Sequence, residues 1–157
     1  MKHIALTTLA VLAAASAYAQ LPNPYGASVT LDQAKKIAAL SVAEAAKNNW
    51  KMAIAIVDVA GDLVYFEKMD GTQVASVNIA QDKARSSVRF KRPTKAMQDV
   101  LAAGGAGVRF LALQGAIPVE GGLPLLIDGK IVGAIGASGG TSDQDGLAAK
   151  AGADSVK

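Results

Sequence analysis

The stretch "GGLPLLIDGKIVGAIGASGGTSDQDGLAAKAG", residues 121–152, carries most of the information about the fold. Asp128-Gly129 separates two apolar runs and is typical of a two-residue hairpin turn. We therefore expect strands at about 123–127 and 130–138. Thr141 and Gln144 then form a capping-box signature, which predicts an alanine-rich helix over about 142–151.

The glycines of this stretch raise the question of whether it binds a ligand. Gly133 and Gly136 lie inside the second strand, where glycine weakens pairing unless another group approaches closely. The helix that follows offers free amides, which attract anions, but Asp143 and Asp145 already complement its dipole. We favour a structural cap, and a small ligand pocket at Gly139-Gly140 stays as the alternative.

The other segments alternate between helical and strand patterns. Thr30 and Gln33 form a second capping box, and Thr94 follows Pro93, where it can cap a helix. Gly104 to Gly107 reads as a flexible break. The expected helices span 31–48, 74–90 and 94–101, and the expected further strands span 52–59, 63–69 and part of 114–119. About five mostly hairpin-linked strands with segregated helices indicate an α+β domain on an antiparallel sheet.

The first 19 residues have the pattern of a secretory leader. Lys2 and His3 precede a short apolar run, and Ala17-Tyr18-Ala19 matches a small-x-small cleavage site. We expect cleavage after Ala19, an irregular arm over 20–29 and one domain over 30–157. The mature protein would then be periplasmic or secreted, without membrane insertion.

Cysteine and histidine usage excludes several kinds of site. The sequence has no cysteine, and its single histidine is in the predicted leader. The mature chain therefore lacks the usual zinc ligands and the imidazole of a Ser-His-Asp or Cys-His arrangement.

Basic residues are concentrated in one segment. Lys83, Arg85, Arg89, Lys91, Arg92 and Lys95 lie within 13 positions that contain no acid. Such a patch attracts anions, although a solvated helix face explains it equally well. We expect no nucleic-acid partner for an exported protein.

Together, "VDVAGDLVYFEKMDGTQVASVNIAQDKA" and the stretch 121–152 resemble the GlcG/HbpS family, also known as haem-degrading or haem-binding proteins and similar to the C-terminal domain of PduO-type proteins. The resemblance extends from Leu31 to about Val156. It implies a profilin-like, three-layer α/β/α fold with a five-stranded antiparallel sheet. It also implies homo-oligomers built from dimers, up to an octamer, and haem as the cofactor.

Haem iron usually takes His, Cys, Met or Tyr as ligand. In the mature chain we expect Tyr25 and Met69 as the weak candidates, because Met52 and Tyr65 fall in predicted strands. Arg89, Lys91 and Arg92 are the candidates for the haem propionates.

A second site hypothesis places a small carboxylate beside the glycine-rich turn. Lys83 lies on the apolar side of its predicted helix and would be the counter-ion and the candidate catalytic residue. The proposed ligand-binding set is Asp70, Gly71, Lys83, Gly121, Gly122, Ser138, Gly139, Gly140 and Thr141.

Three functions remain open at this point. The leading one is an exported, oligomeric binding protein for haem, a related tetrapyrrole or a small carboxylate. An enzyme would need Lys83, Asp70, Asp145 or Glu120 as its acid or base, or would use haem iron to degrade haem. The third is a non-catalytic accessory subunit of a sensor or transport system.

The leader hypothesis is tested by mass spectrometry of the protein purified after expression of the full sequence in its own host. We expect a chain that begins at Gln20, because Ala19 ends the cleavage pattern. A chain that keeps His3 would contradict the hypothesis.

Overall fold

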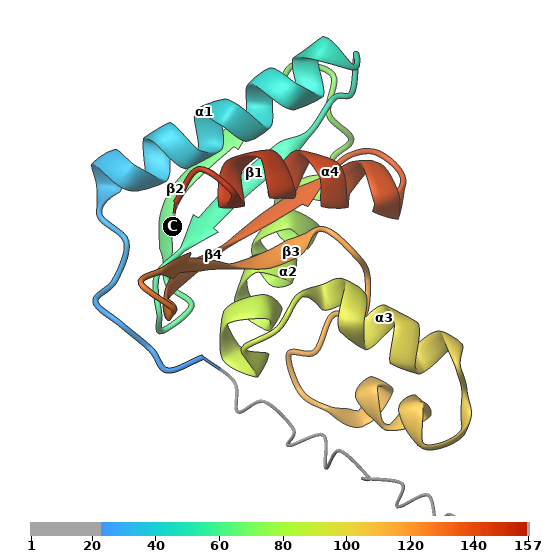
Figure 1. Cartoon of the computed structure of the whole chain (residues 1–157). Coiled ribbons are helices and arrows are strands. Elements are labelled where there is room, and N and C mark those ends of the chain that lie inside the picture. Colours follow the sequence, from blue (N-terminus) through green and yellow to red (C-terminus); the bar gives the residue numbers. More distant parts are fainter. Residues whose placement is uncertain (1–22, 157) are drawn as a thin grey trace, which may run out of the picture.

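The computed structural model describes residues 23–156, and the predicted leader lies outside this range. Four helices, one 3-10 helix and four strands follow one another along the chain (Figure 1). Their bounds are α1 Leu31–Lys47, β1 Ala53–Val57, β2 Leu63–Lys68, α2 Ser76–Phe90, α3 Thr94–Ala102, η1 Gly105–Ala112, β3 Gly122–Ile127, β4 Lys130–Ser138 and α4 Ser142–Ala153.

The strands form one antiparallel sheet in the order β2-β1-β4-β3. The α+β class with an antiparallel sheet is thus confirmed, but the described residues contain four strands rather than five. The strand expected within 114–119 is absent, because Gln114 and Gly115 form a turn and Val119 bonds back to Ile117. Pro118 also has no N–H for a ladder.

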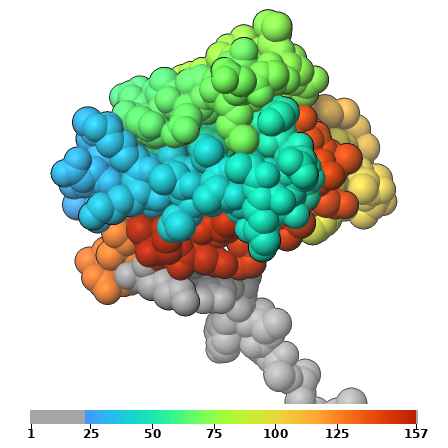
Figure 2. All heavy atoms as spheres, turned by 90° about the horizontal axis from the view of Figure 1, so that it is seen from above, coloured from blue at the N-terminus to red at the C-terminus, as the bar shows by residue number. Residues whose placement is uncertain are grey.

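Helices cover both faces of the sheet, which gives three layers (Figure 1). On one face α1 and α4 lie side by side, as Figure 2 shows in blue-cyan and red, and α2 covers the other face. Side chains of β1 alternate accordingly: Ile54 and Ile56 join the core under α1 and α4, whereas Ala53, Ala55 and Val57 join the core under α2. A strand buried on both faces explains the continuous apolar run in the sequence. The described residues contain no helix long and apolar enough to cross a membrane.

Local capping agrees with the sequence at two of the three predicted positions. Thr30 and Thr141 each accept the amide of the residue three positions on and complete capping boxes. Thr94 does not cap α3, since Pro93 occupies the N-cap position. Its buried hydroxyl instead accepts the Gly122 amide at 2.9 Å, which attaches the start of α3 to β3. The break expected at Gly104 to Gly107 is wrong for most of its length, because η1 begins at Gly105 and Gly104 is its N-cap.

The described part of the N-terminal arm is held along the start of β4. The Gly26 amide donates to the Ile131 carbonyl at 2.8 Å, and the Val29 amide donates to the Val132 carbonyl at 2.7 Å. The Tyr25 hydroxyl donates to the Val88 carbonyl at 2.9 Å and so joins the arm to α2. Residues 23–29 of the arm contain no helix, and Tyr25 forms an isolated bridge with Ile131, so this part of the arm is bonded to the domain.

Gly136 explains how α2 approaches the sheet so closely. A Cβ at Gly136 would lie 2.0 Å from the Ala80 carbonyl oxygen of α2. Helix and strand backbones are therefore in direct contact at this position.

We expect Gly136→Ala to lower the free energy of unfolding by about 1–3 kcal/mol through overpacking, measured by urea denaturation.

Gly105→Asn is the matched control. Gly105 has a left-handed φ of 54° and no atom near its missing Cβ, and asparagine tolerates this conformation. A change within about 0.5 kcal/mol is expected there. Equal effects of the two variants would contradict the close-contact explanation.

Candidate functional site

Most of the residues predicted to bind a small carboxylate meet at the end of β4. Ser138 ends this strand, Gly139 and Gly140 form the turn, and Thr141 caps α4. Gly121 lies beside them, because its carbonyl accepts the Ala137 amide at 2.9 Å. Of the neighbours predicted for this turn, Gly121 lies at the end of β4, whereas Asp70 and Gly71 do not contribute to the site, as described below.

Lys83 reaches this place from α2 on the opposite side of the strand. Its side chain is only 1% exposed. Its Nζ donates to Asp145 Oδ2 at 2.7 Å and to the Ala137 carbonyl at 3.3 Å. The lysine on an apolar helix side thus points inward, and its charge is met by a carboxylate of the same chain.

Asp145 occupies the position that we expected a ligand carboxylate to fill. Its Oδ1 accepts the Gly140 amide at 2.9 Å, while Oδ2 binds Lys83. Burial raises the pKa of the Asp145 carboxyl, and the hydrogen bonds from Lys83, Gly140 and Gly139 offset part of that rise. The glycine-rich turn is therefore an anion site, and the anion that it binds is the Asp145 carboxylate from the first turn of α4.

Tight packing closes the space around this ion pair. A Cβ at Gly121, whose φ is 125°, would lie 2.9 Å from Lys83 Nζ and 2.7 Å from the Ala137 carbonyl oxygen. A Cβ at Gly122 would lie 2.4 Å from the Lys83 carbonyl oxygen. These two glycines therefore allow the segments to touch, and neither cavity described below is lined by Lys83.

The remaining members of the predicted set have other neighbours. Asp70 and Gly71 are exposed on the loop after β2, and the side chain nearest to a Cβ at Gly71 is Lys51. The Ser138 hydroxyl donates to the hydroxyl of Ser76 at 3.1 Å, which links β4 to the start of α2. The hydroxyl of Thr141 caps α4. These contacts give Ser138 and Thr141 structural roles.

The residues of the basic segment have different neighbours. Arg89 lies against the turn between β1 and β2, where its Nε is 3.2 Å from the Cβ position of Gly61. Arg92 is exposed and its Nε donates to the Phe90 carbonyl at 3.1 Å. Lys91 places Nζ 4.2 Å from the centre of the Tyr25 ring. Of the three predicted propionate ligands, Lys91 alone lines a described cavity.

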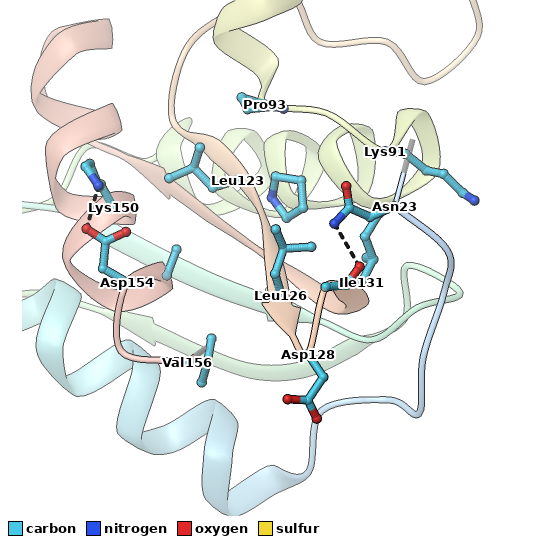
Figure 3. Close-up of a pocket in the computed structure, with 13 residues that line it drawn as sticks. Asn23, Lys91, Pro93, Leu123, Leu126, Asp128, Ile131, Lys150, Asp154 and Val156 are labelled. Carbon is cyan, nitrogen blue, oxygen red and sulfur yellow. Dashed lines mark hydrogen bonds and ion pairs between the residues drawn. The ribbon is translucent and has the colours of Figure 1, made fainter. Parts of the chain in front are cut away.

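A cavity of about 710 Å³ lies beside the edge strand β3 (Figure 3). Ligand cavities usually enclose about 300–1,000 Å³, so its size suits a small molecule. Its apolar wall comes from β3, the start of β4, the N-cap of α3 and the C-terminal end of α4. The residues are Pro93, Leu123, Pro124, Leu126, Ile131, Ala153 and Val156. A smaller cavity of about 350 Å³ lies next to it, between the arm and the Asp128–Lys130 turn.

Polar side chains stand at the rim of the larger cavity. Lys150 pairs with Asp154 on one side. Lys91 lies on the other side, and its ammonium group points away from the cavity (Figure 3), over the ring of Tyr25. The amide of Asn23 donates to the Gly129 carbonyl at 2.8 Å and fixes the hairpin turn there. An apolar floor with separated charges fits a flat apolar molecule that carries a carboxylate.

Sequence reasoning missed this cavity, although one signal was present in the sequence. Pro124 lies in a strand, which is typical of an edge strand. The structure adds that Leu126 of the same strand is 37% exposed. An edge strand with an exposed leucine indicates a surface available to another molecule.

The ion pair of Lys83 and Asp145 generates a stability prediction. Asp145→Leu and Lys83→Met each leave one buried charge unpaired and are expected to cost about 3–5 kcal/mol of unfolding free energy. The double variant is expected to be more stable than either single variant, because no charge remains buried. Urea denaturation measures all three.

Lys47→Met serves as the control, since its pair with Glu44 is exposed and is worth less than about 1 kcal/mol. Additive effects of the two buried substitutions would contradict direct coupling between Lys83 and Asp145.

Solved structures resemble this fold closely. Klebsiella pneumoniae protein ORFY has a TM-score of 0.75 at 30% identity and covers 82% of this chain and 90% of its own. A doubly substituted HbpS of Streptomyces reticuli has a TM-score of 0.77 at 28% identity, covering 84% of this chain and 89% of its own. PduOC, solved as a haem complex, shares the fold with a TM-score of 0.74 at 23% identity and covers 83% and 96%.

Sequence comparisons point the same way. Protein GlcG of Escherichia coli (strain K12) is 38% identical over 105 residues, which are 67% of this chain and 77% of that protein. A family model described as haem-degrading protein HbpS-like matches residues 29–154. The chain therefore belongs to the HbpS-like family, as the two sequence motifs indicated.

Proposed function

We propose that this chain is an exported binding protein that takes haem or a related tetrapyrrole into the cavity beside β3. The observation that carries the proposal is the cavity itself, which joins an apolar wall of leucines and prolines to a lysine at its rim. The description of the family as haem-degrading and the haem complex of PduOC support the same ligand class.

The physical basis of binding is burial of the flat ring against the β3 side chains. Leu123, Pro124 and Leu126 offer apolar surface, and each Å² removed from water contributes about 25 cal/mol. Lys91 stands at the rim without an ion-pair partner among residues 23–156. A propionate gains a charge-assisted hydrogen bond to Lys91 when this side chain turns from the Tyr25 ring toward the cavity.

The positions of three candidate acids and bases favour the binding proposal. Lys83 and Asp145 were two of the candidate acids and bases, and they neutralise each other in a closed site. Glu120 is half-buried next to Lys95, and burial raises the pKa of its carboxyl. It lines neither described cavity.

Self-assembly is the second part of the proposal. The segment of α3, η1 and the following loop forms a lobe beside the sheet (Figure 1) with a single charge, Arg109, between positions 100 and 119. Val108, Leu111 and Leu113 of this lobe are 50%, 68% and 41% exposed. Such a surface is typical of contact with another protein. Homo-oligomers built from dimers, up to an octamer, would cover it.

Haem titration followed by absorbance in the Soret region tests the binding proposal. We expect saturation by the wild-type protein and at least about tenfold weaker binding by Leu126→Glu, a loss of about 1.4 kcal/mol. The reason is that the substitution puts a carboxylate into the apolar wall and beside the propionates.

Leu40→Glu is the matched control, because Leu40 is 47% exposed on α1 and lines neither cavity. It is expected to bind haem like the wild type. Absence of saturable binding, or equal loss in both variants, would refute this site.

A further inference from the structure

We infer that the cavity recognises a tetrapyrrole by its ring and a carboxylate and makes no bond to its metal, so that metal-free porphyrin binds as well as haem. This inference rests on the proposed function, and it specifies the ligand class of the same cavity. The cavity has the volume of a small-molecule site and an apolar wall, but its lining includes none of the usual ligands of haem iron.

The residues that line the cavity contain no ordinary iron ligand. None of them is His, Cys, Met or Tyr, which are the side chains that hold haem iron in proteins. The carboxylates at the rim belong to Asp128 and Asp154, and Asp154 already binds Lys150. The cavity therefore presents its ligand with hydrocarbon, ammonium groups and carboxylates.

The two lysines of the rim are engaged as ammonium groups. Lys150 donates to Asp154, and Lys91 lies over the face of Tyr25 in a cation–π contact. Both contacts depend on the positive charge. An ammonium group has no lone pair to offer a metal, so these lysines suit carboxylates rather than iron.

Tyr25 was one of the two weak ligand candidates, and the structure engages both of its parts. Its hydroxyl donates to the Val88 carbonyl at 2.9 Å, and Lys91 covers its ring. A phenol that ligates iron must release its proton, which here would cost the bond to Val88. Tyr25 thus supports the rim next to the cavity and does not line it.

The sulfur and phenol groups in the rest of residues 23–156 lie elsewhere. Met69, the other candidate, packs against the core cluster under α1 and α4. Met52 and Met97 are fully buried, and the sulfur of Met97 accepts from Ser86. The Tyr65 hydroxyl donates to Glu67 on β2. None of these four side chains lines the cavity.

The experiment compares haem, zinc protoporphyrin and metal-free protoporphyrin IX on the protein obtained by expressing the full sequence. Quenching of Trp50, the single tryptophan, reports binding of all three ligands. We expect dissociation constants within about threefold of one another, which is less than the tenfold step of about 1.4 kcal/mol. Leu126→Glu should weaken all three by the same factor.

Two further variants test whether the protein recognises a carboxylate of the porphyrin. Lys91→Gln is expected to weaken protoporphyrin IX by at least about fivefold and to leave its dimethyl ester unaffected, as a lost charge-assisted bond predicts. Arg92→Gln is the control, because Arg92 is the next residue, is exposed and lies outside the cavity lining.

The outcomes separate the inference from the proposed function. Haem that binds more than about tenfold tighter than metal-free porphyrin would overturn the inference and leave haem binding intact. No binding of any porphyrin would refute the proposed function itself. If haem is preferred, His3→Ala shows whether the iron ligand comes from an uncut leader: loss of the preference assigns it to His3, and persistence assigns it to a mature residue.

Discussion

The buried ion pair of Lys83 and Asp145 is the interaction on which the arrangement of the elements depends. It joins α2 to the first turn of α4 through the end of β4, whose Ala137 carbonyl also accepts from Lys83. These elements lie on opposite faces of the sheet. A charge enclosed at 1% exposure must have its partner, so the pair fixes how the two helical layers meet. The Asp145 carboxylate of the pair also accepts the amide of Gly140 and so occupies the anion position of the glycine-rich turn.

The ion pair requires α2 to approach the sheet closely, and this close approach in turn requires small residues where they meet. Lys83 can reach Asp145 only because α2 touches the sheet at Gly136 and because Gly121 and Gly122 admit the lysine. Alanines supply most of the core beneath α2. Bulkier side chains such as Ile54, Ile56 and Ile135 lie in the core under α1 and α4, and Leu123 and Leu126 of the edge strand β3 form part of the cavity wall.

The four helices and the strands β1 to β4 were predicted from the sequence because each has a local cause, whereas η1 and the absence of a strand within 114–119 were not. Capping boxes, the Asp128-Gly129 turn and apolar periodicity lie within a few residues, and the observed bounds of α1 and α4 differ from expectation by one or two residues. The site was harder. The gathering of Lys83, Gly121 and Gly139 was foreseen, but the carboxylate that satisfies them was not assigned, because helix-dipole arguments gave Asp145 a sufficient role already. The cavity depends on segments more than 100 residues apart, such as Asn23 and Gly129, which no short-range pattern links.

Asn23 and Val156 stand near the two limits of the described chain, and both border the same hollow. A segment joined to either end, such as an unprocessed leader, an affinity tag or a fused domain, is therefore attached next to the entrance of the cavity. Tethering raises its local concentration there by orders of magnitude over the same segment free in solution. Under the proposed function, a change at either terminus is therefore expected to alter access of the ligand to the cavity, and recombinant forms with different termini are expected to differ in affinity.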